Sequence, residues 1–182
     1  MHTEKISLGD RAMAGMIAAN GFCEPMDLHG RYVVEAFDAD GNLKWREEID
    51  NLVTTAGKNA ALDQVFSGTA FGTAYMGLVD GGSTPTYAAG DIMSSHAGWT
   101  ENTGYSNGTR PQPTWNSAAS GSKATTATAF NINATVTIAG VFIATNSTKG
   151  GTTGTLYSCG SFSGNRSLIS GDTLNVTYTA SA

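Results

Sequence analysis

Four short segments in the last third of the sequence are rich in β-branched and aromatic residues, and each is bounded by Gly, Asn or Ser. They cover residues 126–132, 135–144, 155–162 and 173–178. Side chains of this kind favour strands, and the residues that bound them favour turns. Many short strands with little helix between them predict a mainly β fold: an antiparallel β-sandwich of the jelly-roll or immunoglobulin-like kind, with one or two short helices.

Two alternating segments nearer the N-terminus predict a β-hairpin. Residues 32–37 and 43–49 direct successive side chains to opposite faces, as half-buried strands require. Asp40-Gly41-Asn42 between them tolerates positive φ angles, which short hairpin loops use. The same acids do not fit a calcium loop, because a loop that begins at Asp38 puts Gly41 at position four, where the calcium motif needs its glycine at position six.

A helix is predicted over residues 55–66. Thr54 or Thr55 can cap its first turn, and Ser67-Gly68 follows its last. Its apolar side chains recur at helical spacing, and Ala61, Leu62, Val65 and Phe66 line one side of it.

The remainder of the chain contributes a buried strand and a long loop. Residues 74–79 predict the strand, and residues 84–113 predict the loop, with a helical turn near residues 91–95. The expected core includes Val136, Ile138, Val141, Phe142 and Ile143.

Residues 1–29 form a region apart from the predicted sandwich domain of residues 30–182. Asp10 can cap a short helix that ends at Asn20-Gly21. One face of that helix would carry Met13, Met16 and Ile17. Two interpretations stay open: the helix packs on its own domain, or the region is an arm that reaches a neighbouring subunit, since Met side chains adapt to uneven partner surfaces. In the second case these three side chains are the candidate partner interface.

The distribution of charge argues against nucleic acid as a partner. Residues 1–53 hold ten acids and five bases, whereas residues 54–182 hold five of each. A chain of this kind has no basic surface with which to bind phosphate backbones. The first residues lack the basic lead and apolar run of a signal peptide, and no stretch has the length of a membrane span, so we expect no membrane partner and synthesis in a cytoplasm.

The sequence offers no pattern typical of catalysis or of metal binding. The histidines, His2, His29 and His96, are far apart and have no second ligand at helical or hairpin spacing. Cys159 lies in an apolar segment and is expected in the core, although the sequence does not decide whether it pairs with Cys23. We therefore expect a non-enzymatic protein without cofactor or metal.

Two further motifs have plain interpretations. Glu47 and Glu48 are neighbours in a strand, so they point to opposite faces and suit solvent better than paired acid-base chemistry. Residues 149–154 are rich in glycine, but Lys149 precedes the glycines and a strand follows them, whereas a phosphate loop places its lysine after the glycines and before a helix. We expect a flexible hairpin loop there.

Several aromatic residues border the long central loop. Trp99, Tyr105 and Trp115, together with Tyr87, can either pack beneath the loop or form an exposed platform on which a sugar stacks. The second alternative would make the protein a carbohydrate-binding module.

An ordered set of motifs over residues 28–182 resembles a family of small structural proteins of tailed bacteriophages. The set comprises the hairpin from Gly30 to Trp45 with the pattern G-x-Y-x-x-E-x-F-D-x-x-G-x-L-x-W, then residues 51–59, 75–79, 96–101, Arg110-Pro111, residues 144–151 and residues 172–178. The resemblance implies a β-domain of the virion that acts through many copies. It transfers no catalytic residue.

Within the virion, the resemblance leads us to expect a capsid decoration, or cement, protein. Its partners would be the major capsid protein and further copies of itself, as a homo-oligomer, on particles assembled in the cytoplasm of the bacterial host. A tail, head-tail connector or head-fibre component is the alternative.

Overall fold

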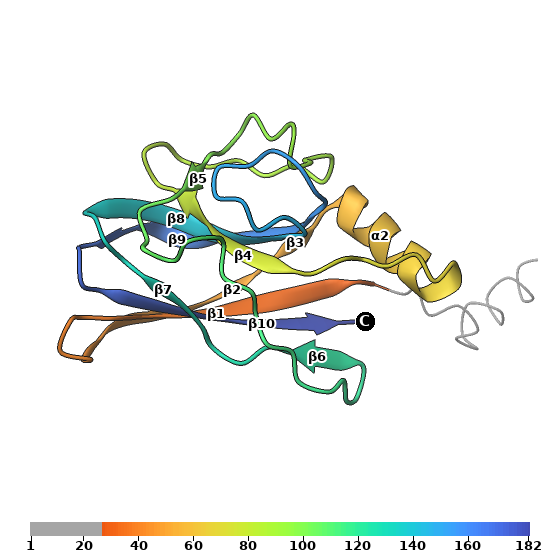
Figure 1. Cartoon of the computed structure of the whole chain (residues 1–182), viewed down its shortest axis with the longest axis horizontal. Coiled ribbons are helices and arrows are strands. Elements are labelled where there is room, and N and C mark those ends of the chain that lie inside the picture. Colours follow the sequence, from red (N-terminus) through yellow and green to blue (C-terminus); the bar gives the residue numbers. More distant parts are fainter. Residues whose placement is uncertain (1–26) are drawn as a thin grey trace, which may run out of the picture.

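The computed structural model describes residues 27–182, which form two antiparallel sheets packed face to face (Figure 1). The predicted antiparallel β-sandwich is therefore confirmed. The predicted short helix of residues 10–20, its side chains Met13, Met16 and Ile17, and Cys23 lie outside the described residues.

The first sheet is built around the two ends of the described chain. Its order is β2 (Leu43–Asp50), β1 (His29–Phe37) and β10 (Thr173–Ser181), and both β6 (Ser122–Ala124) and β7 (Thr128–Asn131) pair with the free edge of β10. The second sheet has the order β3 (Leu52–Val53), β9 (Leu156–Leu168), β8 (Val136–Ala144), β4 (Tyr75–Asp80) and β5 (Glu101–Asn102).

The hairpin of β1 and β2 forms as the alternation predicts. Gly41 occupies its turn with a φ of +83°, a conformation that favours glycine. The Asp38 carboxylate accepts hydrogen bonds from the backbone N–H groups of Asp40 and Asn42 and from the Asn42 side chain. These bonds, with the Asn42 side chain foremost, hold the pKa of Asp38 below its usual value. The acids of this stretch thus shape a turn.

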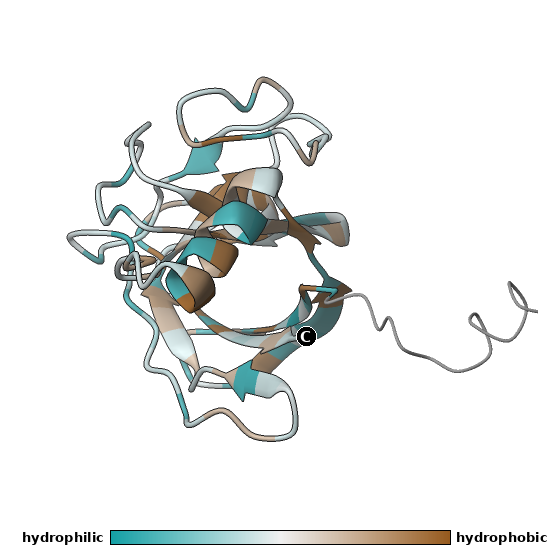
Figure 2. Ribbon diagram, turned by 90° about the vertical axis from the view of Figure 1, so that its right-hand side faces the viewer, coloured by the Kyte–Doolittle hydropathy of each residue, from teal (hydrophilic) through white to brown (hydrophobic). Residues whose placement is uncertain are grey.

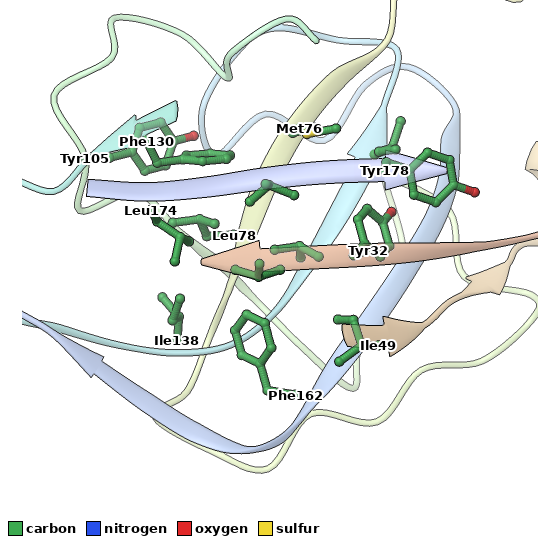
Figure 3. Packing of buried hydrophobic residues seen from close by; sticks show 14 of the residues in the cluster. Tyr32, Ile49, Met76, Leu78, Tyr105, Phe130, Ile138, Phe162, Leu174 and Tyr178 are labelled. Carbon is green, nitrogen blue, oxygen red and sulfur yellow. The ribbon is translucent and has the colours of Figure 1, made fainter. Parts of the chain in front are cut away.

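The core lies between the sheets and is supplied by alternate residues of the long strands. Tyr32, Leu174 and Tyr178 of the first sheet face Leu78 and Ile138 of the second (Figure 3). Of the expected core residues, Ile138, Val141, Phe142 and Ile143 are buried, whereas Val136 is only half-buried at the start of its strand.

Strand β8 is buried on both faces. Val141 and Ile143 belong to the core between the sheets, while Phe142 and Ala144 belong to a second apolar cluster with Met93 and other side chains of the long loop. A strand covered on both sides needs apolar residues at every position, which explains the unbroken apolar run. The predicted helical turn near residues 91–95 is wrong: Ile92 and Ser95 exchange two backbone hydrogen bonds across a tight turn instead.

Helix α2 (Thr55–Phe66) begins where the sequence predicts, and Thr54 is its N-cap. The Thr54 hydroxyl accepts a hydrogen bond from the Gly57 N–H at 3.0 Å and donates one to the Leu156 carbonyl of β9 at 2.5 Å. Gly57 lies so close to the Tyr157 backbone of β9 that a residue with a Cβ atom would not fit there. The first turn of the helix is therefore fixed to the second sheet.

Most of the apolar side of α2 is exposed. Leu62, Val65 and Phe66 are 38%, 68% and 78% exposed, and Gly57 is the helix's one buried residue. The first turn is fixed to β9, and the helix then extends beyond the end of the second sheet (Figure 1), which leaves these three side chains exposed. Within residues 27–182, no helix is long and apolar enough to cross a membrane.

Replacing Gly57 with alanine should destabilise the fold, although alanine is the better helix former by about 1 kcal/mol. The new Cβ atom would lie 2.4 Å from the Tyr157 carbonyl oxygen, so the helix must move away from β9. We expect a loss of about 1–3 kcal/mol in the free energy of unfolding by urea titration. Asn59→Ala, at an exposed position of the same helix, is the matched control; equal stability of the two variants would contradict the close approach.

Candidate functional site

The aromatic residues beside the long loop do not share a surface. Trp99 is 3% exposed and stacks on His96 with 3.9 Å between ring centroids, and Tyr105 is 1% exposed and meets the Phe130 ring edge-on. Trp115 is partly buried against Tyr178 in another region of the core. Trp99 and Tyr105 therefore pack in the interior, and the three rings do not share one exposed surface.

Two residues that could take part in catalysis, His96 and Cys159, have structural surroundings. His96 contacts the Trp99 carbonyl oxygen through Nδ1 at 3.0 Å. Cys159 is fully buried, and burial, with a smaller contribution from the charge of Asp91, raises the pKa of its thiol to about 12. A thiol of that kind is a poor nucleophile near neutral pH. Among residues 27–182, no three His, Cys, Asp or Glu side chains are placed to hold a metal ion.

The neighbouring acids of β2 do point to opposite faces. Glu48 lies on the outer face and bonds with Arg31 and Arg46, whereas Glu47 turns inward to the Arg166 guanidinium at 2.7 Å. Burial alone would raise the pKa of Glu47, but hydrogen bonds from the Ser163 N–H and from Arg166 outweigh it, so the pKa is lowered. The inward turn of Glu47 corrects the expectation that both acids suit solvent.

A buried ion pair organises the loops that cover the second sheet. Arg110 is fully buried, and its guanidinium donates to both oxygens of the Glu101 carboxylate, at 2.9 Å from Nε and 2.7 Å from one terminal nitrogen. The terminal nitrogens also donate to the carbonyls of Asn146 and Gly151, both at 2.9 Å. The guanidinium carbon lies 5.1 Å from the centre of the Phe142 ring.

The glycine-rich loop is held by the same pair. The Gly150 N–H donates to a Glu101 oxygen, and the Lys149 ammonium donates to the carbonyls of Tyr105 and Asn107 at 2.7 and 3.0 Å. Lys149 also lies over the Tyr105 ring. The predicted hairpin loop does connect β8 to β9, but contacts distant in sequence hold it, so the expected flexibility is not what these contacts indicate. These groups bond to one another, so we assign the cluster to structure.

An apolar opening lies at the end of the sandwich that carries α2, which Figure 2 views end-on. It is a groove of about 550 Å³ between α2, the two segments around Phe71 and Trp115, and the ends of the first sheet. We call it the α2 groove. Its wall consists of Ala61, Gln64, Val65, Phe71, Gly72, Thr73, Ala74, Gln112, Pro113, Trp115, Lys123, Ile143, Tyr157 and Ala180.

A second apolar feature stands beside the groove. Leu62 and Phe66 are four residues apart in α2 and so share a face of the helix, but neither lines the groove. We call this pair the 62/66 stripe. Exposed apolar side chains that gather at one place mark surfaces that bind other molecules. Sequence periodicity placed these two residues on one side of the helix, but it does not show that this side is exposed.

Comparison with known proteins adds no relative. Neither a scan against protein-family models nor a search of curated proteins finds a match for this chain.

Proposed function

We propose that this chain is a structural protein of a tailed-bacteriophage virion, and specifically a capsid decoration, or cement, protein that binds the head shell. The observation that carries the proposal is the 62/66 stripe, in which Leu62 and Phe66 project from a helix fixed to a β-sandwich. The ordered motifs of residues 28–182, which resemble small virion proteins of such phages, support the same conclusion.

The chemistry of this end suits burial against protein. The stripe offers two large apolar side chains, Leu62 and Phe66, at exposed positions of α2. The core of a protein interface is depleted in charged residues and enriched in aromatic ones, and Phe66 fits that composition.

A modest interface suffices for this role. Each copy would contact the major capsid protein and a neighbouring copy of itself through a small area, and the lattice of the shell would repeat that contact many times. The anchored first turn of α2 presents the stripe with little loss of freedom on binding, which favours affinity.

The copy number of this chain in purified particles tests the proposal. A decoration protein should be present at a number comparable to that of the shell subunit, as measured by quantitative mass spectrometry with isotope-labelled peptides of both proteins. A ring-sized number would assign the chain to the tail or connector, and a few copies would assign it to a head fibre. Either result, or absence from the particle, would overturn the proposed role as a cement protein.

A further inference from the structure

We infer that the α2 groove is the docking site of the chain's own residues 10–20, whose Met13, Met16 and Ile17 side chains fill it. The inference concerns the free protein, so it does not depend on the proposed place in a virion. It assigns an occupant to the groove and leaves the 62/66 stripe exposed to a partner.

The groove has the composition of an interior surface. Ala61 and Val65 of α2 form one side, and Phe71, Pro113 and Trp115 form another. Phe71 and Trp115 pack on the core beneath and are only partly buried. Covering this surface removes apolar area from water, which contributes about 25 cal/mol for each Å² buried.

The described chain begins beside this groove. The Asp27 carboxylate lies 4.0 Å from the Lys58 ammonium of α2, the helix that forms one wall. Gly30 of β1 pairs with Ala180 of β10, and Ala180 itself lines the groove. Residues that precede Asp27 are therefore attached at the correct end of the sandwich.

The length of the connection favours docking within one chain. Six residues separate Asn20 from Asp27, and six extended residues reach about 20 Å. A helix over residues 10–20 would be about 16 Å long. A tether this short gives a local concentration in the millimolar range, so at micromolar protein the chain's own segment outcompetes that of a neighbour.

The apolar side chains of the segment match the groove. Met16 and Ile17 follow Met13 by three and four residues, which would place the three side chains on one face of a helix. Methionine adapts to irregular apolar walls, and the groove is built from side chains of several unrelated segments. The segment thus offers apolar side chains that can cover the groove without a change in the rest of the fold.

Cross-linking of the full chain tests this inference. The variant carries Cys23→Ser, Met16→Cys and Val65→Cys; Val65 is an exposed groove residue, so the substitution should be tolerated. Cys159 stays in place because it is buried. With a short bismaleimide at micromolar protein, we expect an intramolecular link, seen as a monomer of shifted mobility and confirmed by peptide mass.

The matched control pairs Met16→Cys with Leu43→Cys. Leu43 is 55% exposed and lies by the β1–β2 turn, at the end opposite α2 (Figure 1). We expect the groove pair to link about tenfold faster than this control, because only the groove holds residue 16 nearby. Adding Met13→Asp and Ile17→Asp to the groove pair should remove that advantage.

Three results would overturn the inference. Equal linking rates for the groove pair and the control would mean that the segment does not dock. A predominantly intermolecular link would assign the groove to the segment of a second copy. If the groove pair still links faster than the control when Met13→Asp and Ile17→Asp are added, the apolar face of the segment is not what binds it to the groove. Loss of the proposed virion role would leave all these rates unchanged, so the two proposals fail separately.

Discussion

Replacing Arg110 with methionine is expected to lower the free energy of unfolding by about 3–5 kcal/mol, because it leaves the carboxylate of Glu101 buried without its partner. The Arg110 side chain is fully buried and that of Glu101 is 6% exposed. The variant would also remove the donors to the Asn146 and Gly151 carbonyls, so the loops above the second sheet lose their common anchor.

Urea titration of three variants separates the ion pair from a general effect of charge. Arg31→Met removes exposed ion pairs to Glu48 and Asp50, and we expect a change of less than about 1 kcal/mol. The double variant Arg110→Met/Glu101→Gln should recover part of the loss, since a neutral amide is less costly to bury than a carboxylate. Similar small losses for Arg110→Met and Arg31→Met would show that the buried pair does not organise the loops.

The parts of the fold that sequence could predict are those that local patterns determine. The alternation around Gly41 gave the hairpin, and Thr54 marked the start of α2. Segments rich in β-branched residues gave the four strands near the C-terminus, although β9 runs through to Leu168, well past the predicted end at Phe162. Strands β3, β5 and β6 were missed because two or three residues carry no periodic signal.

The parts that could not be predicted depend on contacts distant in sequence. Nothing local shows that Arg110 meets Glu101 and the carbonyls of residues 146 and 151, yet this cluster unites three of the motifs that carry the phage resemblance. The exposure of Phe66 could not be predicted for a related reason. A periodic apolar face predicts burial against something, but only the tertiary structure shows whether the partner belongs to the described part of the same domain.

Changing the 62/66 stripe to Leu62→Asp/Phe66→Asp is expected to leave the fold intact and to reduce binding to the virion. Both side chains are already exposed, so the free energy of unfolding should change by less than about 0.5 kcal/mol. An aromatic anchor at the centre of an interface contributes about 2 kcal/mol or more, and a buried aspartate adds a penalty. Binding should therefore weaken by at least roughly thirtyfold.

Two controls keep this result interpretable. Leu43→Asp and Ile169→Asp change exposed apolar residues away from α2, and each should bind as the wild type does. The intramolecular link between residues 16 and 65 should persist in the stripe variant, because neither Leu62 nor Phe66 lines the groove. If the stripe variant binds the virion poorly but still forms the link between residues 16 and 65, only its surface for the virion partner has been lost.

The proposed role is tested most directly by the number of copies retained per purified particle when wild-type, stripe-variant and control chains are assembled side by side. We expect wild-type occupancy for Leu43→Asp and Ile169→Asp and near-complete loss for Leu62→Asp/Phe66→Asp, with all four proteins folded. Full occupancy of particles by the stripe variant would contradict the claim that this chain acts through the apolar end of its sandwich.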